Sequence, residues 1–186
     1  LTRFAETLLP LLSEDPSNAT KIAKAILSGY PERFGDQYIA RFRAKFGLPR
    51  EAPVGLIQEC LDLLATQAVD FTLFFRQLTR VADGEDSQAL VAMFCSSAPF
   101  EKWFAKWRCE ADTATHLADM RAANPILIPR NHRVGQAIQS AYAGDFAQFH
   151  RLVDALAAPY ADQVEYADLE TPPRPEEIVH ETFCGT

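Results

Sequence analysis

The sequence predicts an all-α fold: a helical, bundle-like domain over residues 1–158, followed by an extended C-terminal tail over residues 159–186. Three observations lead to this prediction. Apolar residues recur at intervals of three and four along most of the chain, which is the period of a helix buried on one face. No stretch shows the sustained alternation of a half-buried strand. After Pro159 the helical period is lost, and a proline-rich composition favours an extended course over the helices.

Composition limits both the architecture and the partners. With 186 residues, 48% of them hydrophobic, the chain can bury one substantial core but not two large ones. Its net charge of -7 argues against nucleic-acid binding, which requires a basic surface. No apolar run approaches the ~20 residues of a membrane-spanning helix. The four cysteines form no CxxC pair, so they predict neither a disulfide framework nor a zinc site, and a reducing compartment fits them best.

The first third of the chain predicts two or three helices. The opening one ends before Pro16, and Ser17 or Asn18 is expected to cap the next. The pattern leaves open whether Pro31 kinks one long helix or starts a new one. Gly47 is the expected stop. The apolar face of the opening helix comprises Phe4, Leu8, Leu9 and Leu12, and that of the last comprises Phe34, Tyr38, Ile39, Phe42 and Phe46.

The middle of the chain predicts four more helices. Pro53 is expected in the first turn of one, Asp70 caps the second, Ser87 starts a short third, and Pro99 opens the fourth. A turn lies at residues 83–86. The inward-facing residues are expected to be Leu56, Ile57, Cys60, Leu61 and Leu64 in the first helix, Phe71, Phe74, Phe75 and Leu78 in the second, and Phe100, Trp103, Phe104 and Trp107 in the fourth.

Three further helices are predicted towards the C-terminus. A less apolar helix over residues 112–123 ends at Asn124, because a residue before proline is pushed out of the helical region. Asn131 is expected to cap a helix that stops at Gly144, and Asp145 to cap the last. The last helix is expected to bury Phe146, Phe149, Leu152, Val153 and Leu156.

No residue of this chain is predicted to be catalytic or cofactor-binding. Kinase-like chemistry needs a glycine-rich phosphate loop, a lysine on a strand and metal-binding Asp and Asn residues, and neither GxGxxG nor GxxxxGK is present. Asp70-Phe71-Thr72 is superficially similar to a metal-binding DFG motif, but its helical context indicates a helix cap. Arg130 is expected to pair with a carboxylate or a carbonyl.

Other potentially functional side chains have simpler structural interpretations. The four histidines, at positions 116, 132, 150 and 180, lack metal-ligand spacing, so no metal site is predicted. Trp103, Phe104 and Trp107 indicate core packing rather than a stacking platform. Cys60, Cys95 and Cys109 are expected to be buried and inert. An acidic group in the tail is expected to be solvated: Glu165, Asp168, Glu170, Glu176, Glu177 and Glu181.

A family resemblance rests mainly on the C-terminal third. It is carried by Asn124-Pro125-Ile126-Leu127-Ile128-Pro129-Arg130-Asn131-His132, Val134-Gly135-Gln136-Ala137-Ile138, Gly144-Asp145-Phe146, Ala158-Pro159-Tyr160, Pro172-Pro173-Arg174-Pro175-Glu176 and Thr182-Phe183-Cys184-Gly185-Thr186. Weaker support comes from residues 1–5, 42–48 and 70–76. In this order and spacing they resemble the C-terminus of the selenoprotein O family, the YdiU-type proteins of bacteria.

The resemblance implies a kinase-like parent protein that transfers AMP from ATP, with Mg²⁺ or Mn²⁺, to hydroxyl groups of protein substrates. This chain, which opens in helical phase without Met, would be its C-terminal part, with the nucleotide site upstream and no cofactor of its own. Cys184 would be the redox residue, paired with an upstream cysteine; from the residues alone it is only an accessible terminal thiol. A bacterial protein would be cytoplasmic and a eukaryotic one mitochondrial.

The partner implied by the resemblance is the missing N-terminal kinase-like region, together with protein substrates of the parent. A fragment cut from a larger fold exposes an apolar face, and the opening helix, with Leu1, Phe4, Leu8 and Leu9, is the expected place. The alternative is a free-standing helical interaction module. That alternative predicts an opening helix enclosed by its own chain.

Overall fold

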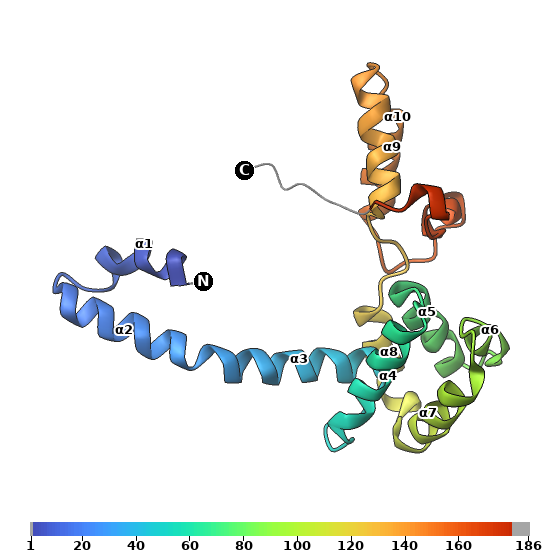
Figure 1. Cartoon of the computed structure of the whole chain (residues 1–186), viewed down its shortest axis with the longest axis horizontal. Coiled ribbons are helices and arrows are strands. Elements are labelled where there is room, and N and C mark those ends of the chain that lie inside the picture. Colours follow the sequence, from blue (N-terminus) through green and yellow to red (C-terminus); the bar gives the residue numbers. More distant parts are fainter. Residues whose placement is uncertain (1, 180–186) are drawn as a thin grey trace. The chain divides into compact units, whose positions relative to one another are not determined.

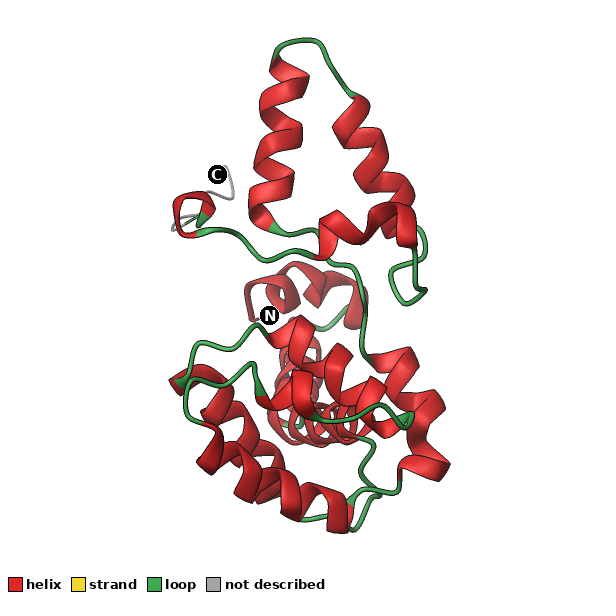
Figure 2. Cartoon of the chain, turned by 90° about the vertical axis from the view of Figure 1, so that its right-hand side faces the viewer, coloured by secondary structure: helices red, strands yellow, loops and turns green. Residues whose placement is uncertain are grey.

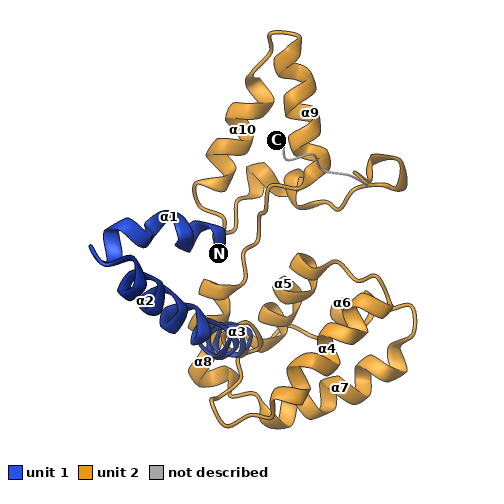
Figure 3. Cartoon of the chain, turned by 60° about the vertical axis from the view of Figure 1, so that its left-hand side comes forward, with its two compact units in different colours: residues 1–42 blue, residues 43–186 orange. Residues whose placement is uncertain are grey.

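The computed structural model describes residues 2–179, and these form two compact units that divide after Phe42, residues 2–42 and residues 43–179. Figure 3 colours the two units separately. Within residues 2–179 the chain forms ten α-helices and two 3₁₀ helices, with no strand (Figures 1 and 2). The all-α prediction is therefore confirmed.

The first unit contains α1 (Thr2–Leu12), α2 (Pro16–Ser28) and the first part of α3 (Tyr30–Phe46). Asp15, and not Ser17 or Asn18, caps α2: its carboxylate accepts hydrogen bonds from both of their backbone N–H groups, at 3.0 and 3.3 Å. Pro16 at the first helical position leaves Asp15 as the capping residue, and the expected cap was wrong.

Pro31 starts a new helix rather than kinking an old one. Gly29 separates α2 from α3, which places Pro31 in the first turn of α3. Arg33 covers the end of α2 by donating from Nη2 to the carbonyl of Ile26 at 2.9 Å and from Nε to that of Gly29 at 3.2 Å. These bonds occupy carbonyls that a helix end leaves without partners.

The apolar side chains of the first unit remain largely exposed. Helix α1 packs on α2, yet none of its described residues is buried, and Phe4 is 64% exposed. Within the first unit, the opening helix is therefore not enclosed. Along α3 an aromatic row with four-residue spacing, Tyr30, Phe34, Tyr38 and Phe42, has successive ring centroids 5.9, 6.2 and 4.7 Å apart.

The second unit has an aromatic core. It is enclosed by the end of α3, α4 (Val54–Thr66), α5 (Phe71–Ala82), α6 (Gln88–Val91), α7 (Ser97–Glu110) and α8 (Thr113–Ala123). Trp103 and Trp107 of α7 donate their indole N–H groups to the carbonyls of Leu56 and Phe46, at 2.8 and 2.7 Å. The prediction that the aromatic side chains of α7 pack in the core is confirmed. The fully buried large side chains are Phe46, Cys60, Phe74, Phe75, Leu78, Leu90, Phe100, Trp103 and Met120.

Two residues bring the ends of helices together in this core. Gly47 ends α3 with φ +62°, a conformation that strongly favours glycine, and lies against buried Met120. Asn124, at the end of α8, is also buried: its Nδ2 donates to the carbonyl of Lys45 at 2.9 Å and to Thr79 Oγ1 at 3.0 Å. The sequence identified Asn124 as a helix stop but not as this buried link.

Helices α9 (Asn131–Tyr142) and α10 (Ala147–Leu156) form a hairpin, visible in Figure 2, with η1 (Val164–Glu170) and η2 (Pro175–Glu177) after it. Gly144 has φ +87° in the hairpin turn, as its predicted stop requires. A small separate core comprises Leu127, Ala155 and Leu169, with Leu152, Leu156 and Tyr166 packed around it.

Several local predictions in the second unit were wrong. Pro53 lies just before α4, at its cap. Phe71 is half-exposed because it is the first residue of α5 and lies at the helix end. Arg130, without a side-chain capping bond, precedes α9, so Asn131 does not cap it. In α10, Phe146, Phe149 and Val153 are half-exposed, because the small core covers only the part of the apolar side that carries Leu152, Ala155 and Leu156.

Candidate functional site

The predicted redox residue, Cys184, lies outside the described residues, so the structure bears on it only through the segment that leads to it. That segment, from residue 159 to residue 179, was expected to be without regular structure and to carry solvated acids. Instead it forms η1 and η2 and is held by three groups of polar contacts. The following contacts define what we call the tail anchor, residues 159–179.

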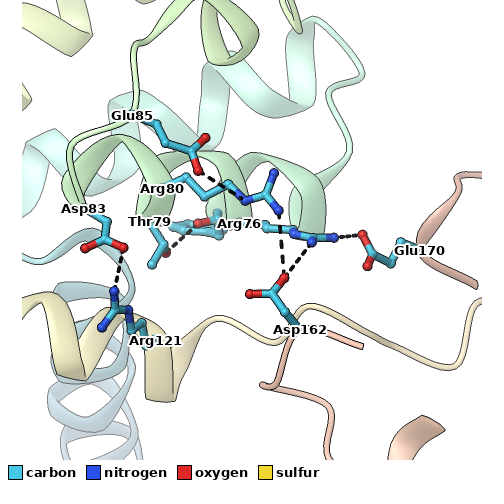
Figure 4. Close-up of polar contacts among 9 residues, drawn as sticks. Arg76, Thr79, Arg80, Asp83, Glu85, Arg121, Asp162 and Glu170 are labelled. Atoms are coloured by element: carbon cyan, nitrogen blue, oxygen red, sulfur yellow. Dashed lines mark hydrogen bonds and ion pairs between the residues drawn. The ribbon is translucent and has the colours of Figure 1, made fainter. Parts of the chain in front are cut away.

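The first group of contacts comes from α5 (Figure 4). Arg76, whose side chain is only 12% exposed, donates from Nη2 to Asp162 Oδ1 at 3.0 Å and also pairs with Glu170. Arg80 lies 3.8 Å from the same carboxylate and 4.0 Å from Glu85. One arginine therefore joins the beginning and the end of the η1 segment to α5.

The second group comes from the α9–α10 hairpin. Arg151 forms a bidentate pair with Asp168, at 2.8 and 2.5 Å, and also donates to the carbonyl of Glu165 at 2.9 Å. Arg133 donates to the carbonyl of Asp168 at 2.9 Å. The hydrogen bond with Arg151 lowers the pKa of Asp168 and raises that of Arg151, so both groups remain charged at neutral pH.

The third group fixes the two ends of the tail anchor. At its start, the backbone N–H groups of Ile126 and Leu127 donate to the carbonyl of Pro159, at 2.8 and 3.1 Å. At its end, Gln136 of α9 donates from Nε2 to the carboxylate of Glu177 at 3.4 Å. Within the tail itself, Arg174 donates from its backbone N–H and from Nη2 to the same carboxylate, at 3.0 Å each. These bonds lower the pKa of Glu177 to about 2. The acids Asp168, Glu170 and Glu177 are therefore paired rather than merely solvated, contrary to expectation.

The anchoring arginines were missed by sequence reasoning. Arg76 and Arg151 occur in amphipathic helices, where an isolated arginine is normally read as part of a solvated face. The partners of Arg76 are Asp162 and Glu170, which lie far from it in the sequence, and only the tertiary fold brings these side chains together. The clustering of acids after residue 160 was the one available signal.

Arg130 and Asp70 form a largely enclosed ion pair in the second unit, with side chains 7% and 24% exposed. The guanidinium donates to both carboxylate oxygens, at 2.7 and 3.2 Å, while Asp70 also accepts from the backbone N–H of Leu73 at 2.9 Å. Burial opposes ionisation of Asp70, but these bonds outweigh it and lower its pKa. Both predictions are confirmed: Asp70 caps α5, and Arg130 pairs with a carboxylate.

The cysteines differ more than expected. Cys60 is fully buried, and burial raises the pKa of its thiol, so it is inert as predicted. Cys95 and Cys109 are exposed, which contradicts the prediction. Cys109 lies on the outer side of α7, away from its buried aromatic face, and Cys95 lies between α6 and α7. Exposed thiols are therefore present well before the C-terminal cysteine.

Residues 2–179 contain no group of three or more His, Cys, Asp or Glu side chains placed to hold a metal ion. His132 is buried at the start of α9, and His116 contacts Asp119 at 3.1 Å within α8. None of the helices in the same range combines the length and apolar character needed to cross a membrane.

Comparison with known proteins gives the family. Residues 1–157 match the family model described as "Protein adenylyltransferase SelO". Over the whole chain, the sequence is 44% identical to the "Protein nucleotidyltransferase YdiU" of Nitrobacter hamburgensis, and 42% identical to proteins of the same description from Rhodopseudomonas palustris and Rhizobium etli. The chain spans 38%, 40% and 39% of the lengths of these relatives. The chain therefore belongs to the SelO family, and it corresponds to part of the length of the relatives it matches.

Proposed function

We propose that this chain is the C-terminal helical region of a bacterial, cytoplasmic protein adenylyltransferase. The whole protein would transfer AMP from ATP, with Mg²⁺ or Mn²⁺, to Ser, Thr or Tyr hydroxyls of protein substrates. The observation that carries this proposal is the family match over residues 1–157, supported by relatives described as nucleotidyltransferases over the whole chain. The chain's role would be to support the large lobe of a kinase-like fold.

Catalysis would require residues outside this chain. Transfer of a nucleotide needs donors that cradle phosphates and carboxylates that hold the metal, and no glycine-rich phosphate loop occurs in the sequence. We expect calorimetry to detect no binding of ATP with Mg²⁺ or Mn²⁺ by this chain, whereas the full-length protein binds under the same conditions. Micromolar binding of ATP by the chain alone would place a nucleotide site within it and contradict the proposal that the nucleotide site lies outside this chain.

Cys184 would carry a redox function in the whole protein. Gln136 of α9 holds η2 through Glu177, and the five residues that follow Val179 can extend at most about 18 Å. A disulfide partner must lie within that reach. Two thiols would lose two protons and two electrons to a disulfide oxidant, such as oxidised glutathione, and reform on reduction. Closing this loop would restrict the catalytic region and make the effect regulatory.

The test is the response of the full-length protein to reductant. We expect AMP transfer by the wild type to change between oxidised and reduced glutathione, and Cys184→Ser to remove that dependence. Cys109→Ser, which removes another exposed thiol, is the control and should leave the dependence in place. Retention of the full redox response by Cys184→Ser would exclude the proposed role of this cysteine.

A further inference from the structure

An open groove of about 330 Å³ lies between helices α9 and α10. Figure 3 shows α9 and α10 as neighbouring helices of one hairpin, and the lining residues of the groove come from both helices and from Pro129. No lining residue is charged, and none has a polar side-chain atom. Its lining consists of Pro129, Val134, Ala137, Ile138, Ala141, Phe146, Phe149, Leu152, Val153 and Leu156.

Large apolar side chains in this groove remain in contact with water. Ile138, Phe146, Phe149 and Val153 are 49 to 53% exposed. An apolar surface that is contiguous and concave is typical of a site that another segment fills, whereas isolated exposed apolar residues are ordinary. Leu152 and Leu156 line the groove and also pack against the small core of Leu127, Ala155 and Leu169. The four exposed side chains take no part in that core.

We propose that the α9–α10 groove binds the remainder of the same polypeptide, through an uncharged segment with aliphatic or aromatic side chains. This rests on the proposed function, in which the chain supports the rest of a larger protein. Relatives are about two and a half times as long as this chain, so most of such a protein lies outside it. A charged segment would be desolvated in the groove without any partner, which excludes it as the occupant.

A second copy of the chain fits the groove less well. In a twofold dimer the same surface meets itself, and two concave grooves placed face to face would leave an empty space between them. A stable interface also needs roughly 800 Å² from each partner. The groove is a slot between two helices, and its shape suits a single inserted helix or extended segment.

Cysteine labelling of the full-length protein tests the proposal. Ile138→Cys places a thiol in the groove, and Tyr142→Cys places one on the same helix, outside the groove lining; the wild-type side chains are 49% and 84% exposed. Cys95, Cys109 and Cys184 are replaced by Ser in both variants. If the groove is open, the labelling rate of Ile138→Cys divided by that of Tyr142→Cys should be about 0.6, the ratio of the two exposed fractions. A covered groove predicts a ratio at least about tenfold lower, after normalisation to the rates in urea.

A second pair of variants guards against local disruption of α9. Val153→Cys lies in the groove on α10, and Asp154→Cys, its neighbour, is exposed outside the lining. We expect the same loss of reactivity for Val153→Cys alone. A ratio near 0.6 for the α9 pair, with no slowing of Val153→Cys in the full-length protein, overturns the proposal. So does an equally low ratio in the isolated 186-residue chain, since residues 1–42 or a second copy would then fill the groove.

The readout is independent of catalysis. A full-length protein that transfers AMP but labels freely at both groove positions contradicts the docking surface alone. A protein with a covered groove and no AMP transfer contradicts the proposed function alone.

Discussion

Replacement of Asp70 by Asn separates the two roles of this residue. The amide keeps an oxygen that can accept from the backbone N–H of Leu73, so the cap of α5 is retained. The negative charge is lost, and the guanidinium of Arg130, whose side chain is only 7% exposed, loses its counter-ion. The substitution therefore tests the ion pair and leaves the helix cap in place.

The expected cost follows from burial. Breaking a buried ion pair by removing one partner costs about 3–5 kcal/mol, because a charge is left without compensation. Asp70 is about a quarter exposed, so water compensates part of this loss, and we expect about 2–3 kcal/mol. Asp70→Ala also removes the cap and should cost about 1 kcal/mol more. In a chain of this size, 2–3 kcal/mol lowers the Tm by about 4–12 °C.

The assay is thermal and urea denaturation of this chain, with Glu59→Gln as the matched control. Lys106 pairs with Glu59 at 2.8 Å, but these side chains are 57% and 41% exposed, so the control should cost less than about 1 kcal/mol. Equal effects of Asp70→Asn and Glu59→Gln would refute the reasoning that burial makes the Arg130 pair important.

The pH dependence provides an independent check of the same pair. The pKa of Asp70 is lower in the folded protein than in the unfolded chain, so the pair stabilises the fold above about pH 4. This contribution is lost as the pH falls through the folded-state pKa. The stability difference between wild type and Asp70→Asn should therefore shrink below pH 4, while a constant difference would point to packing rather than charge.

Two further predictions concern packing and thiol exposure. Gly47→Ala should destabilise the chain by at least about 2 kcal/mol in urea denaturation, because φ is +62° and the new Cβ would lie 2.6 Å from Met120 Sδ. Gly135→Ala is the control: it has open space around it and should stabilise α9 by about 0.5–1 kcal/mol. Equal stabilities of the two variants would contradict this. Mass-spectrometric alkylation should modify Cys109 in the folded chain and Cys60 only on unfolding, and comparable rates would refute the assigned burial.

The sequence by itself determined the helices and most of their ends. The period of apolar residues identified the buried aromatic face of α7, and Gly47 and Gly144 gave the helix stops, because these signals act within a few residues along the chain. The cap by Asp70 was predictable for the same reason. The family resemblance was also contained in the order and spacing of short motifs.

The tertiary structure alone decided which side chains meet across long separations. Arg76 pairs with Asp162 across 86 residues of sequence, and Arg130 pairs with Asp70 across 60. No local sequence pattern specifies either pair. Periodicity marks the apolar side of α10, but not whether another segment covers it; the small core takes one part of that side and leaves Phe149 and Val153 in the groove. Whether a helix face is buried depends on the segment that packs against it, and that segment lies elsewhere in the chain or outside it.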